Sequence, residues 1–458
     1  MTSIAAWTGL SAVVLFLFAN VQMVNMAGGN AYLAVAFGGI IWAAFARKHP
    51  LRSIAVRPSA IPLMAFLTYL LLRVLLDAPE PAELGTLMFG TTGGLLFSLL
   101  LGTATSVFLC ILHESRSGAR QVLFSLIFLV ACVALGFGAY RAHMSSIRED
   151  IFLIAGAGSF YQRPGNFMIV VVLIASALLA QATQQPTRHG RPRAVRAIFA
   201  LTYVALLAVL MVISQLLGSN TGFVVILFLG VGTLSWLWRP NIGVWECCAA
   251  IRRKKFNAAA ALRRSFGRLV TNGLLVAAGM SALGLILLST AGLHLRQFRI
   301  FGFSEGRVGG NSLAGRISLL SRDFLTQFAY DPIFGNLKAD VLTTGPGTYA
   351  HSLISLLSHV GIVGALLFAT YIAVAFRDQV RANLSAAAFY GSVDLNVFRF
   401  VAVSVIMGFS LIGTFFTWMP LWFSLGLLFP PVVVLSPAVA PPTESQLYPP
   451  RARGDIGA

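Results

Sequence analysis

The chain has 458 residues, of which 57% are hydrophobic and only 10% are charged. A soluble domain of this size carries about 25% charged residues, so lipid is the expected solvent for most of this chain. Its net charge of +18 would suggest nucleic acid in a soluble protein, but in a membrane protein such an excess holds the cytoplasmic loops inside. The composition therefore excludes a soluble nucleic-acid-binding protein and predicts an all-α, polytopic membrane helix bundle.

Apolar segments of about 20 residues, the length that crosses a bilayer, recur along the chain. The first has no Lys or Arg before its apolar core, which favours a retained span over a cleaved signal. The segments predict a transmembrane bundle over 1–436, followed by a cytoplasmic tail over 437–458 whose Pro-rich part we expect to be disordered. The twelve predicted spans are 4–24, 30–46, 61–76, 95–112, 122–140, 166–183, 198–217, 222–238, 269–290, 353–376, 400–417 and 420–436.

Lys and Arg are unevenly distributed between the predicted loops. The gaps after even-numbered spans and the C-terminal tail hold 23 of the 33 Lys and Arg residues, whereas the odd-numbered gaps hold nine. Because cationic loops remain in the cytoplasm, both termini are predicted inside and the odd-numbered gaps outside. None of the four cysteines lies in an external gap, so no disulfide framework is expected.

The longest external gap, 291–352, separates the ninth and tenth spans. Within it, 313–330 has apolar residues at helical spacing and predicts an amphipathic helix. Those positions are Leu313, Ile317, Leu320, Phe324 and Phe328. A loop of this length with aromatic residues is usually functional, so we expect it to form a cap over the outer ends of the bundle.

Several kinds of chemistry are disfavoured by what the chain does not contain. The predicted spans hold no Asp or Glu, which ion-coupled transporters usually place there. No His and Cys spacing predicts a metal site, and no glycine-rich phosphate loop follows a strand. We therefore expect neither a metal nor another cofactor, and no dependence on ATP.

Arginine is the conspicuous external residue, because the segment 291–352 holds five Arg and one Lys. Guanidinium binds phosphate with two hydrogen bonds and keeps its charge, so Arg163, Arg316 and Arg322 are candidate ligands for an anion at the outer leaflet. The alternative is that each is solvated or contacts lipid headgroups. For Arg73, inside the third span, the alternative is an ion pair with Asp77 one turn away.

His351 follows the polar segment and begins the tenth span. It shares a helix face with Ser355, whereas His359 lies about 80° around the helix and is expected to pack or cap within the span. An interfacial histidine at a helix start would explain His351 without function. The functional alternative is a group that takes a proton from an acceptor hydroxyl or stabilises a leaving diphosphate.

Four short motifs, together with twelve spans and a large segment after the ninth, resemble the O-antigen ligase and O-antigen polymerase superfamily of bacterial inner membranes. The motifs are Gly315-Arg316, Asp331-Pro332-Ile333-Phe334-Gly335, Tyr349-Ala350-His351-Ser352 and Gly361-Ile362-Val363-Gly364. The topology covers the whole chain, and the motifs cover about 315–370. Near the sixth span, Arg163 and Asn166 resemble the family's R-x-G-x-x-x-x-N motif with a shortened spacing.

The resemblance implies a metal-independent glycosyltransferase of the GT-C kind. Such enzymes take a glycan from undecaprenyl diphosphate at the periplasmic face and join it to an acceptor hydroxyl. The implied catalytic residue is His351, and the implied diphosphate ligands are Arg316, Arg163 and Arg322. Candidates for supporting contacts are Arg73, Tyr349 and Asn220. The implied partners are the lipid-linked donor, the glycan acceptor, membrane lipids and, as an addition, a chain-length regulator protein, but not nucleic acid.

Two departures from the family pattern bear on the acceptor. Ser352 replaces the usual Asn after the histidine, and Ser219-Asn220-Thr221 stands where the family often has Ser-Arg-Gly, so one cation is missing. The three-arginine pattern belongs more firmly to ligases, so we expect a polymerase of O-antigen or exopolysaccharide that extends another lipid-linked repeat unit. The alternatives are an O-antigen ligase acting on lipid A-core, transfer to a protein hydroxyl, and a lipid-linked sugar flippase or transporter.

Overall fold

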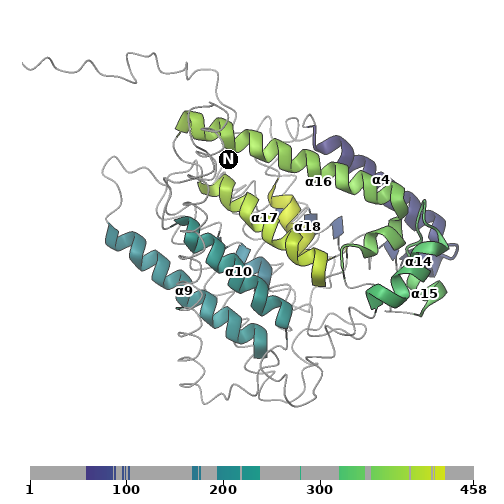
Figure 1. Ribbon diagram of the computed structural model, residues 1–458, viewed down its shortest axis with the longest axis horizontal. Coiled ribbons are helices and arrows are strands. Elements are labelled where there is room, and N and C mark those ends of the chain that lie inside the picture. Colours follow the sequence, from purple (N-terminus) through teal and green to yellow (C-terminus); the bar gives the residue numbers. More distant parts are fainter. Residues whose placement is uncertain are drawn as a thin grey trace, which may run out of the picture.

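Every regular element in the described part of the computed structural model is a helix (Figure 1). The described residues are 58–85, 87–88, 95–96, 98–99, 102–103, 168–173, 175–176, 193–216, 219–237, 279, 319–345, 352–390, 394–413, 416 and 418–428. The all-α prediction is confirmed for these residues. The predicted spans 4–24, 30–46 and 122–140 and the tail 437–458 lie outside them, so the number twelve stays a prediction.

The described helices follow the predicted spans closely in several places. The tenth span is an exception, because its helix continues past the predicted end at 376 and the next helix begins before 400. The elements are α4 (Ala60–Asp77), α5 (Pro81–Gly85), α9 (Arg193–Leu216), α10 (Asn220–Leu237), the π-helix η5 (Leu319–Asp323), α14 (Phe324–Tyr330), α15 (Ala339–Thr343), α16 (Ser355–Tyr390), α17 (Asp394–Gly413) and α18 (Met419–Leu427).

The predicted loop 377–399 is wrong for most of its length, because α16 runs on to Tyr390 and α17 begins at Asp394. The segment Arg377–Tyr390 contains four Ala and two Arg, residues of high helix propensity. Hydropathy marks where lipid solubility ends, and a helix of polar residues can continue beyond that point. The polar continuation of α16 was therefore missed.

Two described helices are long and apolar enough to cross a membrane: Ala60–Asp77 of α4 and Ser355–Gln379 of α16. The exposed positions of α4 include Ile61, Met64, Leu72 and Leu76. A row of exposed aliphatic side chains is unfavourable in water and favourable in hydrocarbon, which favours lipid as the solvent of this face. Three shorter apolar helices are Ala200–Gln215, Asn220–Leu234 and Val401–Leu411.

The predicted absence of acids from the spans is wrong for these two helices. Asp77 is the last residue of α4 and is buried, and Asp378 lies in the apolar part of α16. The hydropathy limits stopped at 76 and 376, one or two residues short of each carboxylate. Both carboxylates have cationic partners, Arg73 for Asp77 and Arg377 for Asp378.

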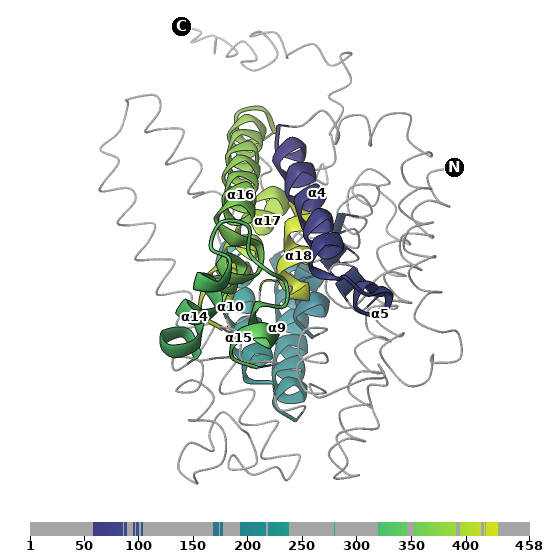
Figure 2. The same ribbon diagram turned by 90° about the vertical axis from the view of Figure 1, so that its right-hand side faces the viewer.

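Helices α4 and α16 pack side by side and antiparallel (Figure 2). Phe66 of α4 lies against Phe368 of α16, with ring centroids 5.4 Å apart. The hydroxyl of Tyr69, which is later in α4, lies 3.0 Å from the carbonyl oxygen of Val360, which is earlier in α16. Trp422 of α18 stacks on Phe66 with centroids 5.9 Å apart and lies 5.6 Å from Phe368. These aromatic side chains form the centre of the described core.

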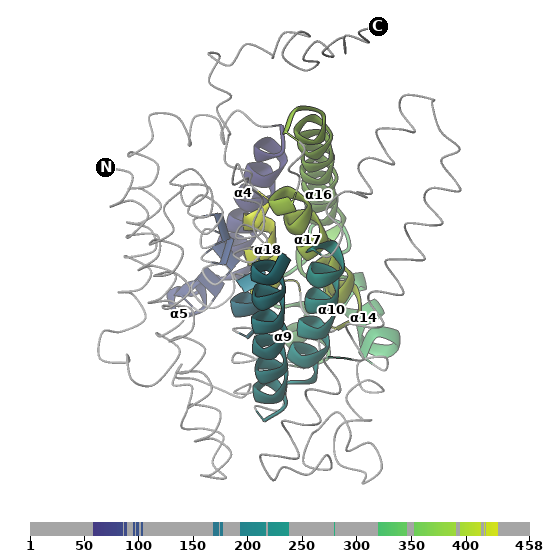
Figure 3. The same cartoon turned by 90° about the vertical axis from the view of Figure 1, so that its left-hand side faces the viewer.

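The remaining long helices are antiparallel to their neighbours as well (Figure 3). Phe228 of α10 contacts Phe409 of α17 at 5.5 Å between ring centroids, and the backbone N–H of Leu353 donates to the carbonyl of Ser410 at 2.7 Å. The start of α10, the end of α17, the start of α16 and the end of α4 therefore face the same way. We call this side of the bundle the cap end.

Residues 319–345, which we call the cap, lie at this end of the bundle (Figure 1). The helix predicted over 313–330 is confirmed for 319–330, where η5 leads directly into α14, and 313–318 lie outside the described residues. Phe324 and Phe328 stack at 5.9 Å between ring centroids. α14 packs against α15 and α16, and the predicted position of the cap over the bundle ends stays a prediction.

Candidate functional site

The centre of the site is a break in α16. Gly361 has φ 63° and ψ −175°, which are not helical values. The next two backbone N–H groups turn outward and donate to the cap: Ile362 to the carbonyl of Pro332 at 3.0 Å, and Val363 to the carbonyl of Ile333 at 3.1 Å. A tight turn in the cap, Asp331–Gly335, therefore supplies the acceptors for these two amides of the broken helix. We call it the cap turn.

Carbonyl groups on the other side of the break are satisfied from the cap and from α4. The N–H of Asn336 donates to the carbonyl of Ser358 at 3.2 Å. The hydroxyl of Tyr69 lies within hydrogen-bond distance of two carbonyls, those of Phe334 and Val360. Irregular backbone at membrane depth is tolerated only where protein groups satisfy it. The cap turn, the break and Tyr69 meet that requirement together, and we call them the junction.

Two positions at the junction, Gly335 and Gly361, leave no room for a side chain. Gly335 has φ 72°, and a Cβ there would lie 2.2 Å from the backbone nitrogen of Gly361. A Cβ on Gly361 would lie 2.3 Å from the carbonyl oxygen of Ile333. Real Cβ atoms do not approach backbone this closely, and left-handed backbone angles already favour glycine. The motifs Asp331–Gly335 and Gly361–Gly364 are therefore parts of one contact.

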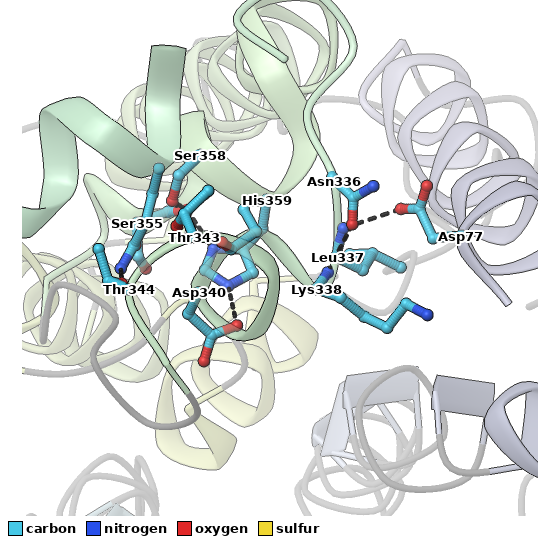
Figure 4. Close-up of polar contacts among 12 residues, drawn as sticks. Asp77, Asn336, Leu337, Lys338, Asp340, Thr343, Thr344, Ser355, Ser358 and His359 are labelled. Carbon is cyan, nitrogen blue, oxygen red and sulfur yellow. Dashed lines mark hydrogen bonds and ion pairs between the residues drawn. The ribbon is translucent and has the colours of Figure 1, made fainter. Parts of the chain in front are cut away.

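A buried ion pair at the end of α4 anchors the cap next to the junction, and Figure 4 shows its Asp77 facing the backbone of Leu337. Arg73 Nη2 lies 2.5 Å from Asp77 Oδ1, and Asp77 Oδ2 accepts the backbone N–H of Leu337 at 2.8 Å. Arg73 Nη2 also lies 3.8 Å from Asp331, whose other oxygen accepts the N–H of Phe334 at 3.0 Å. The predicted Arg73–Asp77 pair is confirmed, and it holds both ends of the cap turn.

A buried histidine forms a second contact between the cap and α16 (Figure 4). His359 Nδ1 lies 2.8 Å from the carbonyl oxygen of Ser355 and 3.1 Å from Ser358 Oγ. Because a carbonyl only accepts, Nδ1 is the donor. Nε2 lies 3.8 Å from Asp340 Oδ1 on α15, a contact that is an ion pair when the ring carries a second proton. The ring packs on Phe416 with centroids 5.6 Å apart, so the predicted packing role is confirmed.

The contact between His359 and Asp340 could not have been found from the sequence, because no helical spacing relates the two residues. Asp331 was noticed only as part of a motif, and Asp340 only as one acid among four. The serines of α16 gave a weak signal, since Ser352, Ser355 and Ser358 recur at helical spacing just before a histidine. Ser355 and Ser358 are buried beside His359.

Four of the predicted site residues, His351, Arg316, Arg163 and Tyr349, lie outside the described residues. The next residue in the chain, Ser352, is described. Ser352 Oγ donates to the carbonyl of Leu411 at 2.6 Å, which ties the start of α16 to the end of α17. Ser352 is buried there.

The other three predicted residues are described, and all belong to the cap end. Arg73 is buried in the ion pair, Arg322 is exposed on η5, and Asn220 is the first residue of α10. Asn220 Oδ1 lies 3.5 Å from Gln215 Nε2 across the turn between α9 and α10. In the same turn, Ser219 Oγ accepts the N–H of Gly222 at 3.0 Å.

The acids at the described cap end serve mainly to hold it together. Asp77, Asp331 and Asp340 bind across the junction, and Glu83 Oε2 lies 3.0 Å from Lys338 Nζ. Within the described ranges no group of three or more His, Cys, Asp and Glu side chains could hold a metal ion. The side chain of Arg322, on η5, is exposed, and none of the ion pairs named here includes it. The geometry supports an anchored cap with a cationic surface residue.

Comparisons of the chain with models of protein families, with curated proteins and with solved structures found no match.

The contact between His359 and Asp340 should appear as an energetic coupling. We expect His359→Asn, which keeps a donor near Nδ1 but removes Nε2, and Asp340→Asn to destabilise the protein each alone. The loss of stability in the double variant should be smaller than the sum of the two single losses by about 0.5–3 kcal/mol, because residues in contact couple. Thermal unfolding of the four proteins in detergent measures this.

A matched cycle provides the control. Glu83 belongs to a different ion pair, with Lys338, and is expected to be independent of His359. His359→Asn and Glu83→Gln should therefore give additive losses. Strict additivity in the Asp340 cycle would contradict the proposed contact.

Proposed function

We propose that the protein is a polysaccharide polymerase of a bacterial inner membrane. It transfers a glycan from undecaprenyl diphosphate to a sugar hydroxyl of another lipid-linked repeat unit, without a metal or another cofactor. The multi-pass topology, with both termini in the cytoplasm and the site on the periplasmic side, belongs to the same proposal. The resemblance to the O-antigen ligase and polymerase superfamily is its starting point.

The observation that carries the proposal is the junction. Two of the four motifs behind the resemblance, Asp331–Gly335 and Gly361–Gly364, lie far apart in the chain and meet in one hydrogen-bonded contact. A third motif ends at Ser352, which is fixed to α17 at the same end of the bundle. A scaffold that anchors both ends of the segment Pro346–His351 is what a catalytic histidine in that segment would require.

Charge distribution supports the orientation. The far ends of the described helices contain Arg193 and Arg196 of α9 and Arg377 and Arg381 of α16. Outside the buried Arg73–Asp77 pair, the described cap end contains two cations, Arg322 and Lys338, together with the acids Glu80, Glu83, Asp323, Asp331 and Asp340. Cations accumulate on the cytoplasmic side of membrane proteins, so the cap end is assigned to the periplasm.

Each predicted residue has a chemical role in this reaction. The donor diphosphate would be held by Arg316, Arg163 and Arg322, whose guanidinium groups offset its charge as the glycosyl bond breaks. His351 would take the proton of the acceptor hydroxyl as the new bond forms, or stabilise the leaving diphosphate. Tyr349, Arg73 and Asn220 would give supporting contacts. For Arg73 that support acts through the cap, because its ion-pair partners are Asp77, which binds the cap backbone, and Asp331 of the cap turn.

The test is transfer by the purified protein. Protein in detergent is incubated with a lipid-diphosphate repeat unit and no added metal or nucleotide, and the products are separated on a gel. A ladder is expected for the wild type. His351→Ala and Arg316→Ala are expected to remove it, while Arg377→Ala at the opposite end should leave it unchanged.

Other outcomes distinguish the alternatives. A single shifted product that requires lipid A-core would indicate a ligase. A protein that binds the donor but forms neither product would contradict the transferase proposal. Continued movement of the lipid-linked sugar across vesicles by His351→Ala would favour a flippase, because a flippase does not need the proton acceptor.

A further inference from the structure

The cap turn lies well below the end of α4. Tyr69, whose hydroxyl bonds the carbonyl of Phe334, precedes the last residue of α4, Asp77, by eight residues. At 1.5 Å per residue this is a depth of about 12 Å along the helix. Gly361, which the turn contacts on α16, is likewise about 9 Å below the first residue, Ser355.

At this depth the turn exposes two large apolar side chains. Ile333 is 55% exposed and Phe334 is 51% exposed, although the backbone around them is held by both helices. In a water-soluble loop such residues would be expected to turn inward. Here about half of each side chain stays exposed.

The exposed side chains next to them on the two helices are also aliphatic. Leu72 and Leu76 follow Tyr69 by three and seven residues on α4 and are 52% and 71% exposed. On α16, Ile362 and Leu366 are 43% and 62% exposed. The two side chains of the turn therefore continue the apolar faces of two helices that are long and apolar enough to cross a membrane.

The polar groups of the turn are arranged for the same environment. The carbonyls of Pro332, Ile333 and Phe334 accept from Ile362, Val363 and Tyr69 respectively, and the N–H groups of Phe334 and Gly335 donate to Asp331. These five groups are bonded within the protein, which is what backbone that enters hydrocarbon requires of each group. A turn that is only covered by water has no such need.

We infer that the cap turn is a re-entrant element, with Ile333 and Phe334 in contact with the acyl chains of the leaflet at the cap end. The partner of this surface is bulk lipid hydrocarbon. The inference rests on depth, exposure and hydrogen bonding, and it holds whether or not the chain is a glycosyltransferase. It places the cap partly inside the membrane and not wholly above it.

A spin label measures the depth directly. Phe334→Cys is made in a background in which Cys110, Cys132, Cys247 and Cys248 are serine, labelled with a nitroxide and reconstituted into phosphatidylcholine–phosphatidylglycerol vesicles. Collision rates with oxygen, which concentrates in hydrocarbon, and with a nickel chelate, which stays in water, are compared. Leu72→Cys is the hydrocarbon reference, and Glu80→Cys, an exposed acid after α4, is the water reference.

The label at position 334 is expected to give the oxygen-to-nickel ratio of position 72, and a label at position 333 should agree. A ratio like that of position 80 would show the turn in water and overturn the inference. A label shielded from both reagents would also overturn it, because it would show that protein covers the turn. Gel filtration and the signal at position 72 establish that each variant is folded.

Discussion

Replacing Gly361 by alanine is expected to detach the cap turn from α16. The observed backbone angles, φ 63° and ψ −175°, belong to a region that is essentially restricted to glycine, and a side chain there costs about 1–3 kcal/mol. The added Cβ would also lie 2.3 Å from the carbonyl oxygen of Ile333 and 2.5 Å from the nitrogen of Gly335. Both neighbours are backbone and cannot move aside without breaking hydrogen bonds. We expect a large loss of thermal stability in detergent and of any transfer activity.

Gly408→Ala is the matched control. Gly408 lies in α17 with nothing within 4 Å of the position that a Cβ would take. Alanine has the higher helix propensity, by about 1 kcal/mol, so this variant should be neutral or stabilising. If Gly361→Ala were as stable as Gly408→Ala, the break in α16 would not depend on its glycine.

The second large effect is expected at the buried ion pair. Arg73→Leu leaves the carboxylate of Asp77 buried beside Asp331 with no cation between them. Removing one partner of a buried pair typically costs about 3–5 kcal/mol, because the remaining charge loses its compensation. The variant should unfold at a much lower temperature, and protease should cleave its cap more readily than that of the wild type.

A second substitution should rescue the first. Asp77→Asn keeps an oxygen that can accept the N–H of Leu337 while removing the uncompensated charge, so adding it to Arg73→Leu should restore part of the lost stability. The control is the pair Arg377–Asp378, whose arginine side chain is 46% exposed, and Arg377→Leu should cost less than Arg73→Leu. A double variant less stable than Arg73→Leu alone would show that the carboxylate is not destabilising there.

Hydropathy was sufficient to predict where α4 lies in the sequence. α4 begins and ends one residue beyond the predicted span, since the limits fall where polar residues begin. The Arg73–Asp77 pair was predictable because both residues lie on one helix, one turn apart. The far end of α16 was not, because a helix that leaves the bilayer changes solvent without changing conformation.

Contacts across the chain explain what the sequence could not predict at the site. Gly335 and Gly361 were recognised as motif residues, but their mutual contact follows from how the cap folds back onto α16. The same holds for Asp340 and His359, and for the hydroxyl of Tyr69, which has no distinctive spacing. Of the residues chosen for chemistry, Arg322 is exposed on η5 and Asn220 is the first residue of α10, both at the described cap end, and their roles with a donor remain predictions.

The break at Gly361 also constrains the order in which the polypeptide assembles. The cap turn is synthesised before α16, and the amides of Ile362 and Val363 find their acceptors on it. Inserting α16 alone would leave those amides without acceptors in hydrocarbon, at a cost of several kcal/mol each. Insertion of this helix and seating of the preceding turn are therefore a single cooperative event, and a chain cut between the two would be a poor substrate for membrane integration.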